Sequence, residues 1–161
     1  MATTPIPAPP AQPPLGIYSS RCDDKGRVRL PKEFEEFLRT FTEPQFFVTS
    51  LDGSIGRIYP IQVWRENEKI FEEYDEDPQA AEDIRFLADH WGGLSSIDGQ
   101  GRMLVPPDLR RKIEIEDQKV FLRFYKGGVE LYSEAESERR LARASEALAA
   151  NLPALRKRGL K

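Results

Sequence analysis

Hydrophobic and charged residues alternate over residues 27–30, where valine and leucine are interleaved with two arginines. This period of two predicts a strand with one buried face and one positively charged face. Phe34 and Leu38 lie four residues apart and predict the buried side of a short helix. The elements predicted in this half are the strand, a helix over 31–38, strands over 45–49 and 57–59, and a helix over 61–74.

The second half of the chain repeats this order of elements. Residues 20–31 and 95–106 each contain Asp, Gly, Arg and Pro in the same relative positions, at a constant spacing of 75 residues. A shared motif followed by a shared order of elements indicates an internal duplication. The later elements predicted are a linking helix over 78–91, a helix over 107–113, strands over 119–124 and 130–132, and a helix over 134–150.

Each copy of the motif has the residues of a tight turn. Gly26 and Gly101 fall where a turn between two strands needs a positive φ, which glycine adopts without a steric penalty. The carboxylates of Asp23 and Asp98 are placed to accept backbone N–H groups a few residues ahead. These four residues are therefore predicted to shape the two turns.

Both ends of the chain differ in composition from its middle. Six of the first fourteen residues are proline, which predicts an extended, disordered tail. Apolar residues at helical spacing near the other end are expected to pack on the sheet or on a neighbouring subunit: Leu141, Ala144, Leu148, Leu152 and Leu155. Pro153 is expected to kink or end that helix near Asn151. The predicted organisation is a proline-rich tail over 1–14, a first repeat over 15–77, a linking helix over 78–93, a second repeat over 94–150 and a basic tail over 151–161.

Composition narrows the chemistry available to the chain. The 161 residues include one cysteine and one histidine, too few for a disulfide framework or a Cys/His zinc site. No dinucleotide or nucleotide-triphosphate motif is complete, so we expect no enzyme, no catalytic residue, no metal, no cofactor and no small-molecule substrate. No apolar run is long enough to span a bilayer, so no membrane contact is expected. The net charge of −3 comes largely from an acidic segment over 66–89, with ten acids and two bases.

The duplicated Asp-x-x-x-Arg turns, at Asp23–Arg27 and Asp98–Arg102, resemble those of the MraZ family of bacterial transcriptional regulators, within the AbrB-like swapped-hairpin superfamily. The resemblance covers about 15–141, and 102–110 is especially close to the second motif of the family. It implies an α+β fold of two fused swapped-hairpin half-barrels with peripheral helices. It also implies a cytoplasmic, nucleoid-associated homo-oligomer, ring-like in form. Such an assembly would bind direct repeats in double-stranded DNA upstream of its own cell-division and cell-wall operon, as a repressor.

Basic residues around the two turns are the predicted DNA contacts, because arginine fits both phosphate and the edge of guanine. The resemblance assigns contact to Arg27 and Arg102, and local charge adds Lys25, Arg29 and Arg21. Gln100 is added because its amide can hydrogen-bond a base edge or a phosphate. Gln100 stands where the first copy has Lys25 and adds no charge, so unequal contributions from the two copies are expected. Two other functions stay open: a ring-forming interaction scaffold that has lost DNA binding, and an antitoxin-like partner protein.

Overall fold

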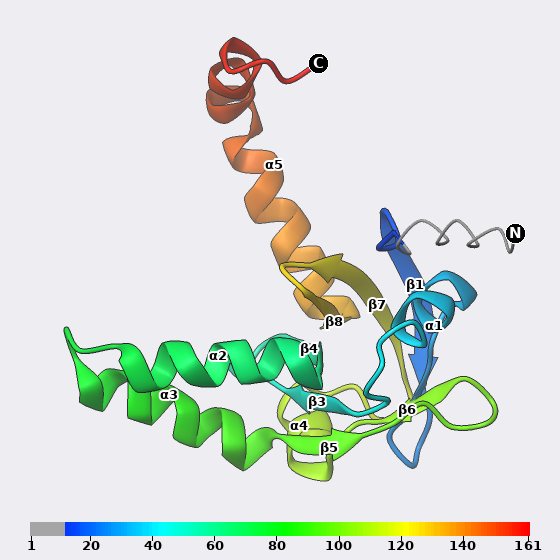
Figure 1. Cartoon of the computed structure of the whole chain (residues 1–161). Coiled ribbons are helices and arrows are strands. Elements are labelled where there is room, and N and C mark those ends of the chain that lie inside the picture. The colour runs from blue at the N-terminus through cyan, green and yellow to red at the C-terminus, as the bar shows by residue number, and fades with distance from the viewer. Residues whose placement is uncertain (1–11) are drawn as a thin grey trace, which may run out of the picture.

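The computed structural model describes residues 12–161, which form eight strands and five helices (Figure 1). The strands are β1 (Ile17–Cys22), β2 (Arg27–Arg29), β3 (Phe46–Thr49), β4 (Gly56–Pro60), β5 (Gly93–Ser95), β6 (Arg102–Leu104), β7 (Gln118–Tyr125) and β8 (Gly128–Ser133). The helices are α1 (Lys32–Leu38), α2 (Ile61–Glu73), α3 (Pro78–Trp91), α4 (Pro107–Lys112) and α5 (Glu134–Lys157). Most of the tail predicted over 1–14 lies outside the described residues. The α+β class is confirmed.

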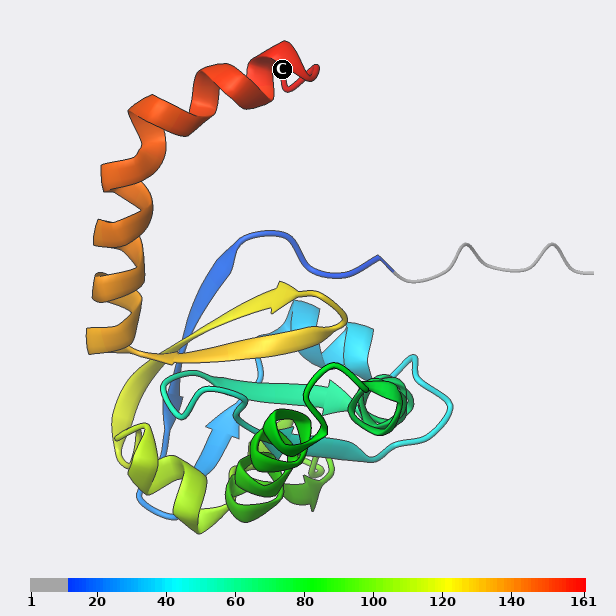
Figure 2. The same ribbon diagram turned by 90° about the vertical axis from the view of Figure 1, so that its left-hand side faces the viewer.

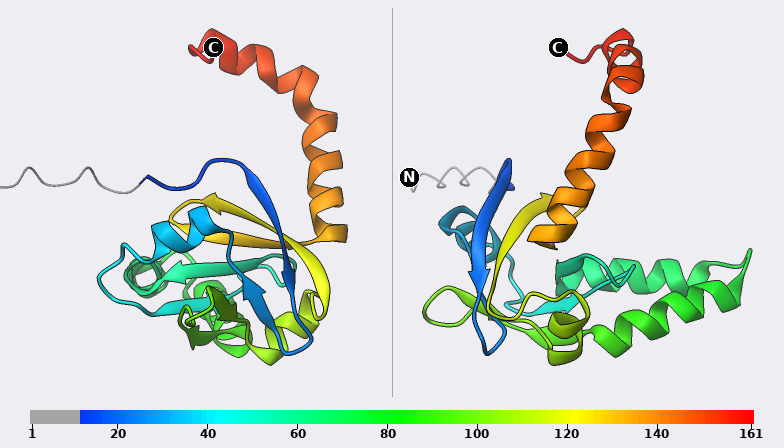
Figure 3. Two further views of the ribbon diagram at one scale, coloured as in Figure 1. Left: turned by 90° about the vertical axis from the view of Figure 1, so that its right-hand side faces the viewer. Right: turned by 180° about the vertical axis from the view of Figure 1, so that it is seen from behind.

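All eight strands belong to one antiparallel sheet, in the order β5-β3-β4-β8-β7-β1-β2-β6. The two outermost strands, β5 and β6, follow each other in the chain, and Met103 of β6 forms a bridge with Ile97, two residues beyond the end of β5. The sheet therefore curls into a nearly closed barrel, as the two views of Figure 3 show. Pairs of strands from the two halves of the chain alternate around it. The hairpin pairs β3–β4, β8–β7 and β1–β2 each come from one half, and the pairs β4–β8, β7–β1 and β2–β6 join the two halves.

The inside of this barrel is one hydrophobic core. The alternation at residues 27–30 is confirmed, because Val28 and Leu30 are buried while Arg29 is exposed. The short helices α1 and α4 close the barrel with their apolar sides, which place Phe34, Leu38 and Leu109 in the core. Burying each of these large side chains contributes roughly 1.5–3 kcal/mol of hydrophobic free energy.

Helices α2 and α3 lie side by side and project from the barrel as an arm (Figure 1). Trp64 on α2 packs with Tyr59 and Ala88 in a small second cluster at the base of the arm. The apolar face predicted for α3 is only partly buried: Ala88 is fully covered, whereas Ile84 and Leu87 are each more than 40% exposed. Packing of α2 against α3 covers only part of this apolar face, so Ile84 and Leu87 stay partly exposed.

Helix α5 leaves the barrel and carries no buried residue along its length. Figure 2 shows that α5 bends partway along. It then continues through Pro153 to Lys157, into the segment predicted as a tail. Packing of the apolar stripe of α5 on its own sheet was one of two expectations and is wrong, because Leu141, Leu148 and Leu155 are each more than half exposed. Most of the stripe stays uncovered because α5 touches the barrel only near its first turns (Figure 1).

Candidate nucleic-acid interface

The two copies of the motif meet in one two-stranded ribbon. Strands β2 and β6 pair antiparallel, and their register places Arg29 opposite Arg102 and Arg27 opposite Leu104. Side chains that lie opposite each other in an antiparallel pair share one face of the sheet. The residues paired between them are fully buried on the other face. Three arginines from segments far apart in the chain therefore share the outer face of the ribbon.

The turn before β2 is organised by a single carboxylate. One oxygen of Asp23, Oδ1, accepts the backbone N–H groups of Lys25 and Arg27, each at 2.9 Å. The other oxygen, Oδ2, accepts a hydrogen bond from Nε of Arg27 at 2.7 Å. The aspartate thus shapes the turn and also fixes the direction of the arginine side chain.

The turn before β6 has the same construction. Asp98 Oδ1 accepts the N–H groups of Gln100 and Arg102 at 2.8 and 2.9 Å, and Oδ2 accepts from Nε of Arg102 at 3.0 Å. Gly26 and Gly101 have φ of +84° and +75°, so both turns use the left-handed region that disfavours other residues.

These hydrogen bonds hold the pKa of both carboxyls below their usual range. The largest cause is the backbone N–H of Arg27 for Asp23 and that of Arg102 for Asp98. The arginine side chains lower the pKa further, because a nearby positive charge favours the ionised carboxylate. Both turns therefore keep their charged hydrogen-bond acceptors at neutral pH.

Backbone hydrogen bonds tie each turn to the opposite half of the chain. The N–H of Leu30 donates to the carbonyl of Gly101 at 2.9 Å, and the N–H of Val105 donates to the carbonyl of Gly26 at 2.8 Å. Each bond links the end of one motif strand to the turn glycine of the other copy. The two turns are therefore held at opposite ends of one ribbon.

Side chains from the short helices fill the space beneath these turns. A Cβ built on Gly26 would lie 2.3 Å from Nη1 of Arg110, and one built on Gly101 would lie 2.8 Å from Oε2 of Glu35. Arg110 is itself held by the carbonyl of Val105 at 3.0 Å. Sequence reasoning missed both supports, although Glu35 and Arg110 share the motif spacing of 75 residues and could have been found by it.

The structure places the six predicted contacts in two groups. Four arginines line a hollow of about 490 Å³, whose residues are Ser19, Ser20, Arg21, Asp23, Arg27, Arg29 and Arg102. Lys25 and Gln100 lie instead at the tips of the turns and are exposed. Arg21 forms an ion pair with Asp117 at 2.7 Å, and Nη1 of Arg29 donates to the carbonyl of Gln100 at 3.0 Å.

The chemistry of this hollow suits an anion. Arg27 and Arg102 use Nε for the turn, and among residues 12–161 no hydrogen bond holds their terminal nitrogens. A guanidinium anchored on one side offers its remaining N–H groups in a fixed plane, the geometry that phosphate and guanine accept. The described part of the chain contains no cluster of His, Cys, Asp and Glu able to hold a metal ion. It also contains no helix long and apolar enough to cross a membrane.

Comparison with curated proteins decides the family. The transcriptional regulator MraZ of Acidobacterium capsulatum is 32% identical over 100 residues, which cover 62% of this chain and 68% of the relative. The MraZ regulator of Koribacter versatilis is 30% identical over 110 residues, covering 68% of this chain and 75% of the relative. The chain belongs to the MraZ family. The MraZ regulator of Thermomicrobium roseum extends the similarity to 145 residues at 30% identity, covering 89% of this chain and 95% of the relative.

Membership of the MraZ family makes the chain a transcription regulator, and the three relatives carry no enzymatic name. A scan against family models gives no match.

Proposed function

We propose that this MraZ-family regulator binds double-stranded DNA sequence-specifically through the outer face of the β2–β6 ribbon. The observation that carries the proposal is the convergence of Arg27, Arg29 and Arg102 on one face, with two of them anchored by aspartates. In this proposal Arg27 and Arg102 contact DNA, while Asp23 and Asp98 position them.

The anchoring supports recognition of a base edge as well as of phosphate. A guanidinium whose Nε is fixed has lost part of its freedom before binding, so less entropy is lost when its terminal nitrogens meet DNA. A bidentate pair between arginine and O6/N7 of guanine contributes about 1–3 kcal/mol of discrimination against the wrong base. Arg21, Arg29, Lys25 and Gln100 supply the surrounding contacts in this proposal.

The arrangement of strands favours an internal duplication of a swapped-hairpin unit. Each motif strand pairs with the equivalent strand of the other copy, and the hydrogen bonds from Leu30 and Val105 are related by the same 75-residue spacing. Two half-barrels that exchange strands in this way would form one barrel with a single ribbon on its surface. The first repeat would span 15–77 and the second 94–150.

One ribbon offers few phosphate contacts, so we further propose that the chain acts as a ring-like homo-oligomer. Non-specific DNA affinities built on several phosphate contacts are only about 10⁻⁴ to 10⁻⁶ M. Several ribbons in one assembly would bind successive direct repeats together, and each contact would raise the effective concentration of the next. By resemblance to the family, the repeats would lie upstream of the chain's own cell-division and cell-wall operon, with repression in the cytoplasmic nucleoid as the result.

Fluorescence anisotropy with the DNA upstream of the chain's own gene tests this function. We expect the wild-type chain to bind with a steep decrease in affinity as salt rises, because each phosphate contact releases counterions. The Arg27→Ala/Arg102→Ala chain is expected to lose this binding. Arg65→Ala/Arg139→Ala is the matched control, because it removes two exposed arginines that lie on α2 and α5, away from the ribbon.

Equal binding of wild-type chain to the upstream DNA and to a scrambled duplex would contradict the proposal. The interaction scaffold or the antitoxin-like partner would then be the better interpretation, because neither requires recognition of this DNA sequence. Equal losses in the ribbon variant and the control would show that overall charge, and not the ribbon, supplies the affinity.

A further inference from the structure

The outer side of the α2–α3 arm carries an aromatic side chain that nothing in the chain covers. Phe86 on α3 is 66% exposed, although phenylalanine is among the most apolar residues. Its neighbours one helical turn away on either side are Glu82, Asp83, Asp89 and His90, which are exposed as well. The arm therefore presents an aromatic knob beside three carboxylates and one histidine.

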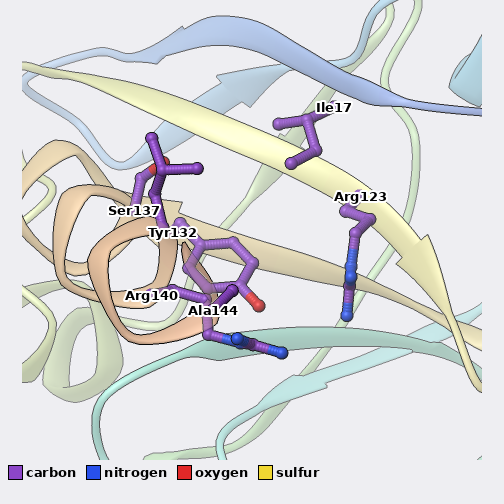
Figure 4. Close-up of a pocket in the computed structure, with 7 residues that line it drawn as sticks. Ile17, Arg123, Tyr132, Ser137, Arg140 and Ala144 are labelled. Carbon is purple, nitrogen blue, oxygen red and sulfur yellow. The ribbon is translucent and has the colours of Figure 1, made fainter. Parts of the chain in front are cut away.

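A pocket of opposite charge lies on another part of the molecule, where α5 leaves the barrel. Its volume is about 220 Å³, and the residues that line it are Ile17, Arg123, Tyr132, Ser137, Arg140, Leu141 and Ala144. Figure 4 shows the guanidinium groups of Arg123 and Arg140 on the same side of the pocket as the hydroxyl of Tyr132. Ile17 and Leu141 supply apolar lining and are each more than 60% exposed.

The pocket contains two arginines that differ in their pairing. Arg123 is ion-paired through Nε with Glu130 at 2.7 Å, and its terminal nitrogens make no hydrogen bond within residues 12–161. Arg140 makes no ion pair or side-chain hydrogen bond with any residue in 12–161. An apolar hollow beside two arginines suits an occupant that combines an apolar side chain with neighbouring carboxylates.

We propose that the knob at Phe86 of one copy of this chain inserts into the α5 pocket of a second copy. Carboxylates of the knob, Asp83 and Asp89, then face Arg123 and Arg140. Opposite charge around an apolar centre matches the usual anatomy of a protein interface, with an aromatic anchor in a pocket and a polar rim. The inference rests on the assembly that the proposed function includes, and it identifies the surfaces that form it.

The arm and α5 project from the barrel in different directions (Figures 1 and 3). The proposed occupant is therefore the arm of a second copy. Because the knob and the pocket are different surfaces, their contact is heterologous, and each copy would keep one free knob or pocket for the next. Such contacts generate a ring when the rotation between copies closes.

Two variants of the full chain, each lacking one surface, test this inference without DNA. Phe86→Ala removes the knob, and Ala144→Trp fills the pocket at an exposed position on α5. Sedimentation velocity is expected to show assemblies for the wild-type chain and association weakened about 30-fold or more in each variant, as for a central aromatic anchor. An equimolar mixture of the two variants is expected to give a 1:1 dimer. The Ala144→Trp chain keeps an intact knob, and the Phe86→Ala chain keeps an intact pocket.

Ile70→Ala is the control, because it removes an apolar side chain of similar exposure on α2, outside the knob and the pocket. The inference is overturned if either variant assembles as the wild type does, or if the mixture stays monomeric. A monomeric wild-type chain would overturn the proposed assembly too. Retained binding of upstream DNA by that monomer would leave the ribbon's role standing, so the two failures are distinguishable.

Discussion

Replacing Gly26 with alanine tests whether the short helix of one half supports the turn of the other. Gly26 has φ of +84°, and an added Cβ would lie 2.3 Å from Nη1 and 2.5 Å from Cδ of Arg110. Real Cβ atoms do not approach other heavy atoms so closely, so the Arg110 side chain has to move. The substitution therefore strains the backbone and displaces a side chain from the opposite half.

The cost follows from these two effects. The left-handed conformation costs an alanine about 1–2 kcal/mol. Moving Arg110 breaks its hydrogen bonds to the carbonyl of Val105 at 3.0 Å and to Glu116 at 3.2 Å. Each is a typical intramolecular bond that contributes about 1 kcal/mol net. We expect Gly26→Ala to lower the free energy of unfolding by about 3 kcal/mol.

The second turn provides a graded comparison. Gly101 has φ of +75°, but a Cβ there would meet the carboxylate end of Glu35. That carboxylate is paired with the exposed side chain of Arg39 and can turn aside together with it. Gly101→Ala is therefore expected to lower the free energy of unfolding only by the cost of the left-handed backbone conformation, about 1–2 kcal/mol. Gly99 lies in the same turn with nothing within 4 Å of its Cβ position, so Gly99→Ala is expected to change stability by less than about 0.5 kcal/mol.

Urea denaturation followed by circular dichroism measures all three variants against the wild-type chain. The expected order of destabilisation is Gly26, then Gly101, then Gly99, with a common dependence on urea concentration. If Gly26→Ala proves as stable as Gly99→Ala, Arg110 does not brace the first turn, and the reasoning is refuted.

Three further predictions concern buried or charged groups. Burial raises the pKa of Cys22 to about 11, so its thiol should not react with a disulfide reagent at pH 8 until the protein is unfolded. The lowered pKa of Asp23 and Asp98 stabilises the fold above their unfolded value of about 3.9. The wild-type chain should therefore lose its stability advantage over Asp23→Asn/Asp98→Asn as the pH falls from about 3.9 through the lower pKa of the folded state. A difference between their urea midpoints that grows over this pH range would contradict the prediction. Glu130→Ala removes the buried carboxylate that pairs with Arg123 at 2.7 Å and with the partly buried Arg57 at 3.9 Å. It should lower the free energy of unfolding by about 3 kcal/mol in urea denaturation, whereas a loss below about 1 kcal/mol would contradict the role.

Local chemistry was enough to predict much of the fold from the sequence. The alternation at 27–30 gave the buried and exposed faces of β2, because a strand has a fixed period of two. The apolar pair Phe34 and Leu38 gave the core side of α1 for a similar reason. These features depend on residues close in the chain, so no knowledge of distant partners was needed.

Features that depend on distant partners could not be predicted in the same way. The pairing of β2 with β6 sets Arg29 opposite Arg102, and nothing within either motif specifies that register. The exposed stripe on α5 has the spacing of a core helix, and only the direction in which α5 leaves the barrel shows that its own sheet does not cover it. Periodicity identifies an apolar face but not the surface that it meets.

The register also changes how charge is divided between the two turns. The sequence suggests a weaker second copy, because Gln100 replaces the lysine of the first turn. In the folded chain, Arg29 crosses the ribbon and binds the carbonyl of Gln100, so a cation from the first copy lies on the second turn. The equivalent position in the second copy is Leu104, which has no charge to offer the first turn in return. Lys25 therefore serves one turn and Arg29 the other. In the proposed DNA complex each turn would contribute its own motif arginine and one additional cation. The positive charge at the two turns would then be more nearly equal than the sequences of the two copies suggest.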